Sequence, residues 1–144
     1  MSPVDTGARY KDAYVPEPRV YTVNGAAHRT IAAAAMTVAA ASLSPRREET
    51  AAHAMVGCAG GYCLGTLPDL LEPATNPHHR QFFHSLAFAA LLAYGLYRLY
   101  QWDPSSSELK ALRFVGLIAG GAYLVHLTLD ATTKRSLPLV GAMR

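Results

Sequence analysis

The sequence has few charged residues for its size. Lys, Arg, Asp and Glu make up 16% of its 144 residues, whereas hydrophobic residues make up 51%. An average soluble domain carries roughly 25% charged residues. This deficit, together with the abundance of alanine, favours a membrane protein built from small, tightly packed helices. A soluble alanine-rich bundle is the competing class.

Cysteine and concentrated positive charge are also scarce. Cys58 and Cys63 are the only cysteines, and they lie five residues apart in an apolar segment, off any common helical face. This argues against a disulfide framework. The formal net charge is +3, and the basic residues form no patch with interleaved aromatics. That pattern argues against a nucleic-acid partner, but a mildly basic edge fits anionic membrane lipids.

The N-terminal 25 residues lack an apolar run after a basic start, so they do not predict a signal peptide. Pro3, Pro16, Pro18 and the Asn24-Gly25 turn signal interrupt this stretch. We therefore predict that residues 1–25 form an extended arm on the membrane interface, on a partner protein or on a second copy of the chain. Residues 26–144 are predicted to form the membrane-embedded helical domain that carries a metal site.

The chain does contain four apolar segments, at about residues 26–43, 50–67, 81–100 and 109–130. Each is close to the roughly 20 residues that cross a hydrocarbon core. The first two owe their apolar character to Ala and Gly, and such small residues let neighbouring helices approach closely. We expect an all-α membrane bundle of about four helices, with interfacial tyrosines ending the third segment.

Ionisable residues crowd into the connection between the second and third segments. They are Asp69, Glu72, His78, His79, Arg80 and His84. Such a crowd beside apolar helices is costly unless something binds it. In an up-down bundle, the start of the first segment and the end of the fourth lie at the same face as this connection. His28, His126 and Asp130 are therefore predicted to join the cluster, with His53 at the opposite end.

Imidazoles and carboxylates in this mixture suit Zn²⁺ or Mn²⁺. His126 and Asp130 are four residues apart and share a helical face; Asp69 and Glu72 share one if the second helix continues through Pro68. The predicted ligands are His28, Asp69, Glu72, His79, His84, His126 and Asp130. This set exceeds the four ligands of one zinc ion, so the number of bound ions, one or two, is left open. Two ions would suit phosphoester chemistry.

Two of these residues also have catalytic interpretations. Glu72 is either a ligand or the base that takes a proton from water. Arg80 either clamps a phosphate or pairs with a neighbouring carboxylate. Ser85 and Thr133 are expected to cap helices or orient ligands. Because the cluster would lie at head-group level, a phosphoester of a lipid or lipid-linked molecule is the favoured substrate.

Three stretches, LPDLLE, HRQFFHS and HLTLDATTKRSLPL, resemble the YdjM-like family of LexA-regulated inner-membrane proteins, which are described as metal-dependent hydrolases. The matching positions are Pro68, Asp69, Glu72, His79, Arg80, His84, Ser85, His126, Asp130, Thr133 and Pro138, with His28 matching an early histidine. Glu72 departs from the family pattern, which more often has an Asp two residues after the first acidic residue. The resemblance covers about residues 26–140 and implies a multi-pass inner-membrane metal-dependent hydrolase.

Functions of other classes fit the same residues. The chain can be a membrane structural or interaction protein whose His/Asp cluster holds a structural metal or senses protons. A closed coordination sphere would favour that hypothesis. A metal-ion transporter would need polar groups along the whole bundle, and the segments offer few beyond the cluster and His53.

Overall fold

The computed structural model describes residues 25–72, 82–133 and 137–140, and these residues form helices and connections without strands. The long helices are α1 (Gly25–Ser42), α2 (Thr50–Leu64), α4 (Leu86–Gln101) and α5 (Ser107–Ala131); the short elements are α3 (Leu67–Leu71) and the 3₁₀ turns η1 (Arg47–Glu49) and η2 (Phe82–His84). The predicted all-α bundle of about four helices is confirmed. The predicted arm lies outside the described residues, apart from Gly25.

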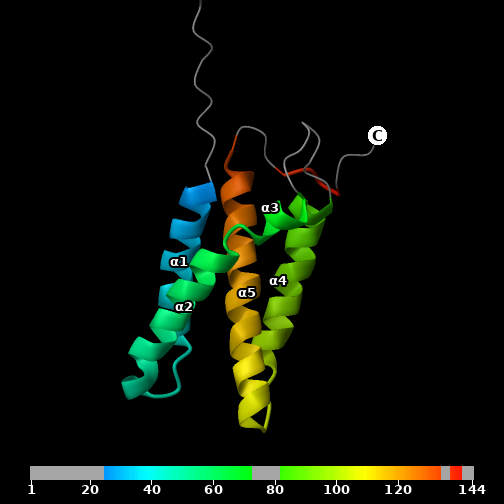
Figure 1. The fold of residues 1–144 in the computed structure, drawn as a ribbon. Helices are drawn as coiled ribbons and strands as arrows, with labels where there is room; N and C mark the ends of the chain where they lie inside the picture. The colour runs from blue at the N-terminus through cyan, green and yellow to red at the C-terminus, as the bar shows by residue number, and fades with distance from the viewer. Residues whose placement is uncertain (1–24, 73–81, 134–136, 141–144) are drawn as a thin grey trace, which may run out of the picture.

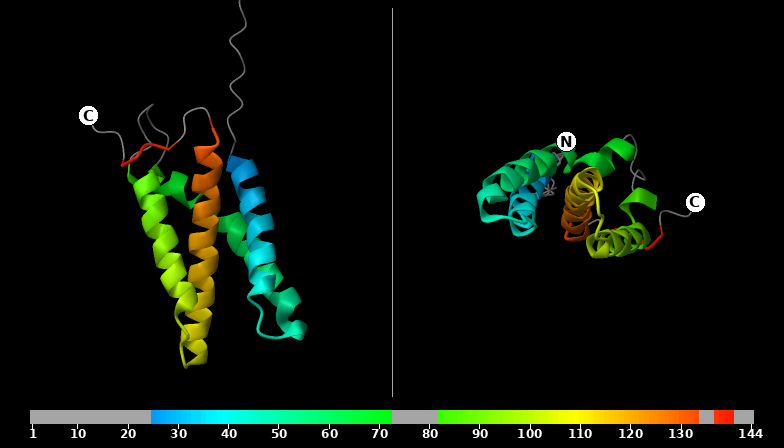
Figure 2. Two further views of the ribbon diagram at one scale, coloured as in Figure 1. Left: turned by 180° about the vertical axis from the view of Figure 1, so that it is seen from behind. Right: turned by 90° about the horizontal axis from the view of Figure 1, so that it is seen from below.

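Helix α5 lies at the centre of the bundle (Figure 1). The hairpin of α1 and α2 packs on one side of it and α4 on the other (Figure 2). Two apolar clusters hold these parts together. One joins Ala32, Met36 and Ala40 of α1 to Ile118 and Ala122 of α5, and the other contains Tyr123, Leu127 and Leu137.

Three glycines bring α2 against α1. Gly57, Gly61 and Gly65 recur every fourth residue, so they lie on one face of the helix. A methyl group added to Gly57 or Gly61 would collide with the backbone of α1, at Met36 and at Ala32 respectively. The two helices are therefore as close as their backbones allow, which confirms the expected packing of small residues.

The second helix ends earlier than predicted. Gly65 is the C-cap of α2, and Thr66, at φ −120° and ψ 14°, breaks the helix before α3 starts. Pro68 lies in the first turn of α3, where its missing N–H costs no hydrogen bond. A second helix continuing through Pro68, the condition under which Asp69 and Glu72 would share one of its faces, is therefore not found. Asp69 sits on the separate helix α3, and Glu72 is that helix's C-cap.

The third long helix begins at Leu86 and not at residue 81. Ser85 caps it, because its Oγ accepts a hydrogen bond from the Phe88 N–H at 3.1 Å. The two N–H groups before that of Phe88 are also bonded: Leu86 donates to the Pro138 carbonyl and Ala87 donates to the Leu139 carbonyl, at 3.0 Å each. Residues 137–140 therefore hold the start of α4.

Among the described helices, α5 alone is both long and apolar enough to cross a membrane; it has 25 residues, against 15 in α2 and 16 in α4. Large apolar side chains nevertheless lie exposed along α2 and α4. They include Met55, Val56, Tyr62, Leu91, Tyr94, Tyr97 and Tyr100. Exposed apolar surface of this extent is typical of a protein that contacts lipid or another protein.

Candidate metal centre

The predicted meeting of ionisable residues at one end of the bundle is found in the structure. The described members are His28 of α1, Asp69 and Glu72 of α3 and its end, His84 of η2, and His126 and Asp130 of α5. His53, in α2, lies instead near the opposite end, in ring contact with Phe114. His79 and Arg80 fall outside the described residues, so their predicted roles stay predictions.

Four of these side chains face one another across short gaps. Asp69 Oδ1 lies 3.4 Å from both His84 Nε2 and His126 Nε2. Asp130 Oδ2 lies 3.5 Å from His126 Nε2 and 3.8 Å from His84 Nε2. Each imidazole thus faces two carboxylates, and each carboxylate faces two imidazoles.

Two sets of three donor atoms lie close enough to share an ion, since the atoms of each set are within 4.8 Å of one another. One set comes from Asp69, His84 and His126, and the other from His28, His126 and Asp130. Nitrogen and oxygen ligands held at about 2.0–2.1 Å in a tetrahedron lie about 3.4 Å from one another, whereas charge-assisted hydrogen bonds would draw nitrogen and oxygen to about 2.7–2.9 Å. The His126 Nε2 atom is buried and makes no hydrogen bond within the described part of the chain. Each set mixes imidazole and carboxylate, which suits a divalent transition metal.

A backbone carbonyl fixes the ring of His126. Its Nδ1–H donates to the Gly65 carbonyl oxygen at 2.8 Å. A carbonyl can only accept, so Nδ1 carries a proton, and Nε2 is the nitrogen that faces the two carboxylates and is left to bind a metal ion. The carbonyl is available because Gly65 ends α2, where the last carbonyls have no partner within the helix.

A carboxylate fixes the ring of His84 in the same way. Its Nδ1 donates to Glu72 Oε2 at 2.8 Å, and the other Glu72 oxygen accepts from the Phe83 N–H at 3.0 Å. The hydroxyl of Tyr123 donates to the Phe83 carbonyl at 3.2 Å and ties this turn to α5. An imidazole held by a carboxylate at one nitrogen is the usual arrangement of a metal-binding histidine.

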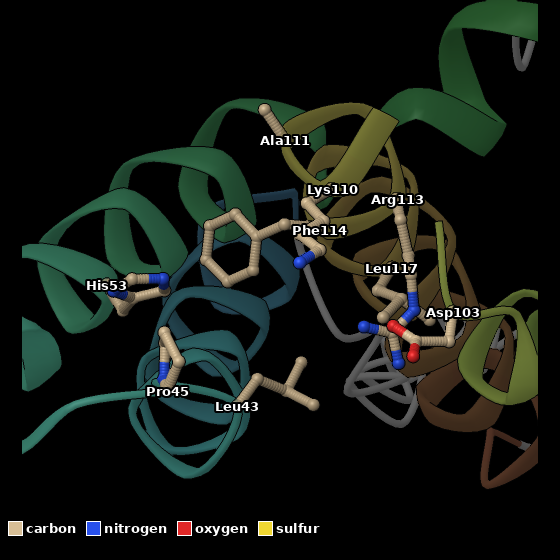
Figure 3. Close-up of a pocket in the computed structure, with 9 residues that line it drawn as sticks. All are labelled: Leu43, Pro45, His53, Asp103, Lys110, Ala111, Arg113, Phe114 and Leu117. Atoms are coloured by element: carbon tan, nitrogen blue, oxygen red, sulfur yellow. The ribbon is translucent and has the colours of Figure 1, made fainter. Parts of the chain in front are cut away.

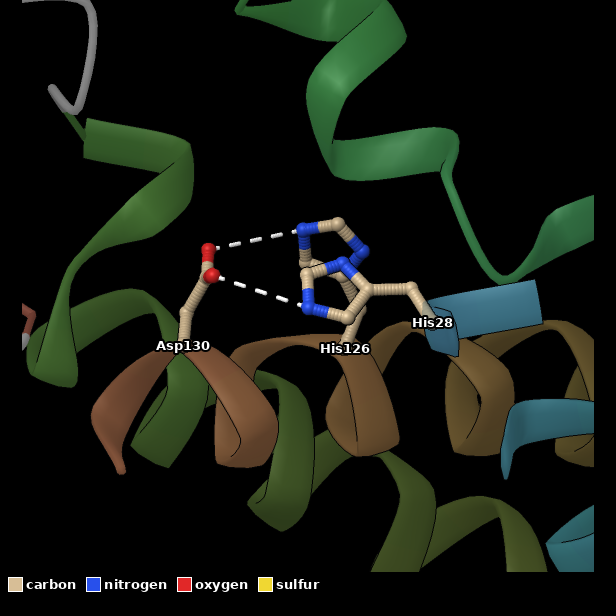
Figure 4. A group of neighbouring side chains, drawn as sticks. All are labelled: His28, His126 and Asp130. Carbon is tan, nitrogen blue, oxygen red and sulfur yellow. Dashed lines mark ion pairs between the residues drawn. The ribbon is translucent and has the colours of Figure 1, made fainter. Parts of the chain in front are cut away.

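Figure 4 shows His28 beside His126, with both rings facing the carboxylate of Asp130. The His28 Nε2 is 3.8 Å from Asp130 Oδ1, and the His28 ring centroid is 4.1 Å from that of His126. The two oxygens of Asp130 thus face different histidines, Oδ1 toward His28 and Oδ2 toward His126. Asp130 could therefore contribute one oxygen to each of two neighbouring ion positions.

The cluster is buried on all sides but one. The side chains of His28, His84, His126 and Asp130 are at most 5% exposed, whereas that of Asp69 is 45% exposed. Water and small molecules therefore approach the cluster from the Asp69 side.

Electrostatics keep the outer carboxylate charged. Burial by itself raises the pKa of Asp69, but its interactions with His126 and His84 outweigh burial and hold that pKa well below its usual value. Burial lowers the pKa of His84, but the carboxylates of Asp69 and Glu72 raise it above its usual value. The cluster thus contains ionised acceptors that attract either protons or a cation.

Two residues that hold the cluster in place, Gly65 and Tyr123, were not predicted from the sequence. Pro68 signals that the helix before it ends and so leaves free carbonyls. Nothing in the sequence pairs one of them with His126, which lies far along the chain. The tyrosine gives no signal of its own within an apolar helix.

A family model described as YdjM inner membrane protein matches residues 23–140. The match includes every described residue of the cluster. Neither the curated proteins nor the solved structures gave a match to the chain.

Proposed function

The chain belongs to the YdjM inner membrane protein family, and on that premise we propose that it is a multi-pass membrane protein acting as a metal-dependent hydrolase. The proposed substrate is a phosphoester of a lipid or of a lipid-linked molecule, because an apolar bundle holds the cluster at one of its ends.

The observation that carries this proposal is the set of three donor atoms from Asp69, His84 and His126, which lie within 4.8 Å of one another. Asp69 Oδ1 lies 3.4 Å from Nε2 of each histidine, a separation that suits ligands of one ion, and both imidazoles are already oriented through Nδ1. Zn²⁺ and Mn²⁺ accept this mixture of nitrogen and oxygen ligands.

Each residue then has a defined task. A divalent ion held by these residues would lower the pKa of bound water and polarise a phosphoryl oxygen. His84 and His126 supply neutral nitrogen ligands, and Glu72 holds His84 in place. Asp69, the exposed carboxylate, lies where substrate enters. Arg80 keeps its sequence-based assignment as a phosphate clamp.

A second ion would bind beside Asp130. His126 offers only Nε2, because Nδ1 carries a proton, and one nitrogen lone pair serves one ion. Among the described residues, His28 and Asp130 Oδ1 would therefore be the ones to hold a second ion. The 3.8 Å between those two atoms leaves room for this arrangement.

The exposure of Asp69 favours catalysis over the structural alternative. A structural metal site is closed by protein ligands, whereas a catalytic one keeps a position open to water. Among the described residues, Asp69, His84 and His126 form a set of three donors, so a four-coordinate ion held by them would keep one position for water. The side chain of Asp69 is 45% exposed, which gives water access to that position. Such a site suits a hydrolase better than a structural metal or a proton sensor.

The test begins with metal analysis of the full-length protein purified in detergent. We expect at least one Zn²⁺ or Mn²⁺ per chain, lost in H84A and D130A but retained in the control H53A. Hydrolysis of short-chain phospholipids and of a phosphate monoester should follow the metal content. Absence of metal in the parent protein contradicts the proposal. Bound metal without hydrolysis of any phosphoester, together with unfolding on chelation, favours the structural alternative.

A further inference from the structure

A cavity of about 450 Å³ lies at the end of the bundle opposite the candidate metal centre. It is lined by the loop after α1, by α2, by the α4–α5 connection and by the first half of α5. The lining residues are Leu43, Pro45, His53, Asp103, Lys110, Ala111, Arg113, Phe114 and Leu117. Its volume falls in the range of pockets that bind small molecules.

At this end of the bundle, the cavity lies between the α1–α2 hairpin and the α4–α5 hairpin. Figure 3 shows His53, Pro45 and Leu43 on one side and Leu117, Arg113 and Asp103 on the other, with Phe114 between them. The Phe114 ring lies 4.7 Å from the His53 ring, and the His53 Nδ1–H donates to the Glu49 carbonyl at 3.0 Å. The wall formed by these two rings is therefore fixed before any ligand enters.

The polar part of the lining is positive. Lys110 and Arg113 contribute two positive charges and Asp103 one negative charge, so the lining carries +1 with His53 neutral. Within the described residues, the Lys110 ammonium makes no ion pair or hydrogen bond. Arg113 is held by the carbonyls of Leu99 and Tyr100, at 3.1 and 2.6 Å. One cation is thus anchored and the other is available to a ligand.

The remaining lining is apolar, and the surroundings are those of a membrane interface. Leu43, Phe114 and Leu117 offer contact to a hydrocarbon chain beside the charged groups. Exposed Tyr94, Tyr97, Tyr100 and Trp102 lie at the same end, on the last turns of α4 and just after it. Such aromatic side chains mark the head-group level of a bilayer.

We propose that this cavity binds the phosphate of an anionic phospholipid, from the leaflet opposite the metal centre. The phosphate lies against Lys110 and Arg113, and the start of one acyl chain lies against Phe114 and Leu117. A free phosphate ion would use the two cations but would leave the apolar lining empty. The combination of charges and apolar surface therefore favours the lipid.

The test uses the full chain in detergent, with binding followed by native mass spectrometry and by thermal unfolding. Phosphatidylglycerol, phosphatidylcholine and inorganic phosphate are compared as probes. We expect phosphatidylglycerol alone to remain bound and to raise the unfolding temperature. Lys110→Ala should weaken its binding about fivefold, as expected for one basic residue at an anionic head group. Ala111→Phe, which fills the cavity without changing charge, should weaken it further.

Arg47→Ala is the matched control, because it removes one exposed positive charge from the same end outside the cavity. The proposal is overturned if Lys110→Ala and Arg47→Ala behave alike, or if inorganic phosphate stabilises the protein as well as the lipid does. Equal binding of phosphatidylcholine also overturns it. Metal content should stay unchanged in all three variants, so this test is independent of the proposed hydrolase.

Discussion

The Nδ1–H of His126 in α5 donates to the carbonyl oxygen of Gly65, a residue 61 positions earlier that ends α2. This bond ties the metal centre to the packing of α2, since the position of Gly65 depends on the close contact between α1 and α2. Substitutions in the glycine face of α2 therefore affect the site as well as the stability of the bundle.

The first prediction concerns that glycine face. Gly61→Ala should destabilise the protein by about 1–3 kcal/mol, because the new methyl group meets the α1 backbone at Ala32. Gly95→Ala in α4 is the control: its methyl group meets nothing within 4 Å, and alanine is the better helix former. Chemical unfolding in detergent should give Gly95→Ala a free energy of unfolding equal to or greater than that of the parent protein. Equal losses in both variants would contradict the packing described here.

The second prediction concerns the carboxylate behind His84. Glu72→Gln should weaken metal affinity about 10–100-fold, because the amide no longer holds the imidazole through a charged acceptor. Affinity is measured by competition with a chromogenic chelator. Metal stoichiometry at saturation should stay that of the parent protein. A drop in stoichiometry would instead indicate that Glu72 binds the metal directly, as its sequence-based assignment allows.

The third prediction concerns pH. Since the carboxylates of Asp69 and Glu72 raise the pKa of His84 above its usual value, the metal-free protein keeps a proton on His84 to a higher pH than an ordinary histidine does. An incoming ion must displace this proton, so metal affinity should rise as the pH increases through the His84 pKa. Calorimetric titrations in buffers of different ionisation heat should detect the released proton.

Glu72→Gln provides the control for this behaviour. It removes one of the carboxylates that raise the pKa of His84, so the rise in affinity should move to lower pH. Metal affinity that does not change between pH 6 and 8 would show that His84 is already neutral in the metal-free protein.

The fourth prediction compares two helix caps. Ser85 accepts from the Phe88 N–H and Ser106 accepts from the Leu109 N–H, so alanine at either position should cost about 1 kcal/mol of stability. Ser85 directly follows His84, whereas Ser106 lies at the other end of the bundle. Ser85→Ala alone should therefore lower metal affinity. If Ser106→Ala lowers it equally, the effect reflects general loosening of the fold.

Much of the fold could be predicted from the prolines and turn residues that interrupt the apolar segments of the sequence. Pro45, Pro68 and the Asp103-Pro104 turn separate the apolar segments, and four segments in an up-down order bring His28, His126 and Asp130 to one end. The serines before Glu108 also indicate where α5 starts, since serine favours the N-cap position and Ser106 occupies it. These signals are local, and the topology follows from them.

What the sequence left open depends on tertiary contacts. The break at Gly65 and Thr66 separates Asp69 from α2, and no local signal distinguishes this break from a bend at Pro68. Glu72 and His84 pair because η2 folds back on the end of α3. Neither propensity nor spacing reports a contact of that kind, and the same holds for the bond between Gly65 and His126.

The contact of residues 137–140 with the start of α4 has a consequence for biosynthesis. During translation His28 and Asp69 leave the ribosome well before His126 and Asp130, and the carbonyls that secure Leu86 and Ala87 follow later still. A nascent chain therefore holds an incomplete donor set until α5 and the segment after it have been made. Loading of the proposed metal ion would therefore follow the synthesis and assembly of these helices.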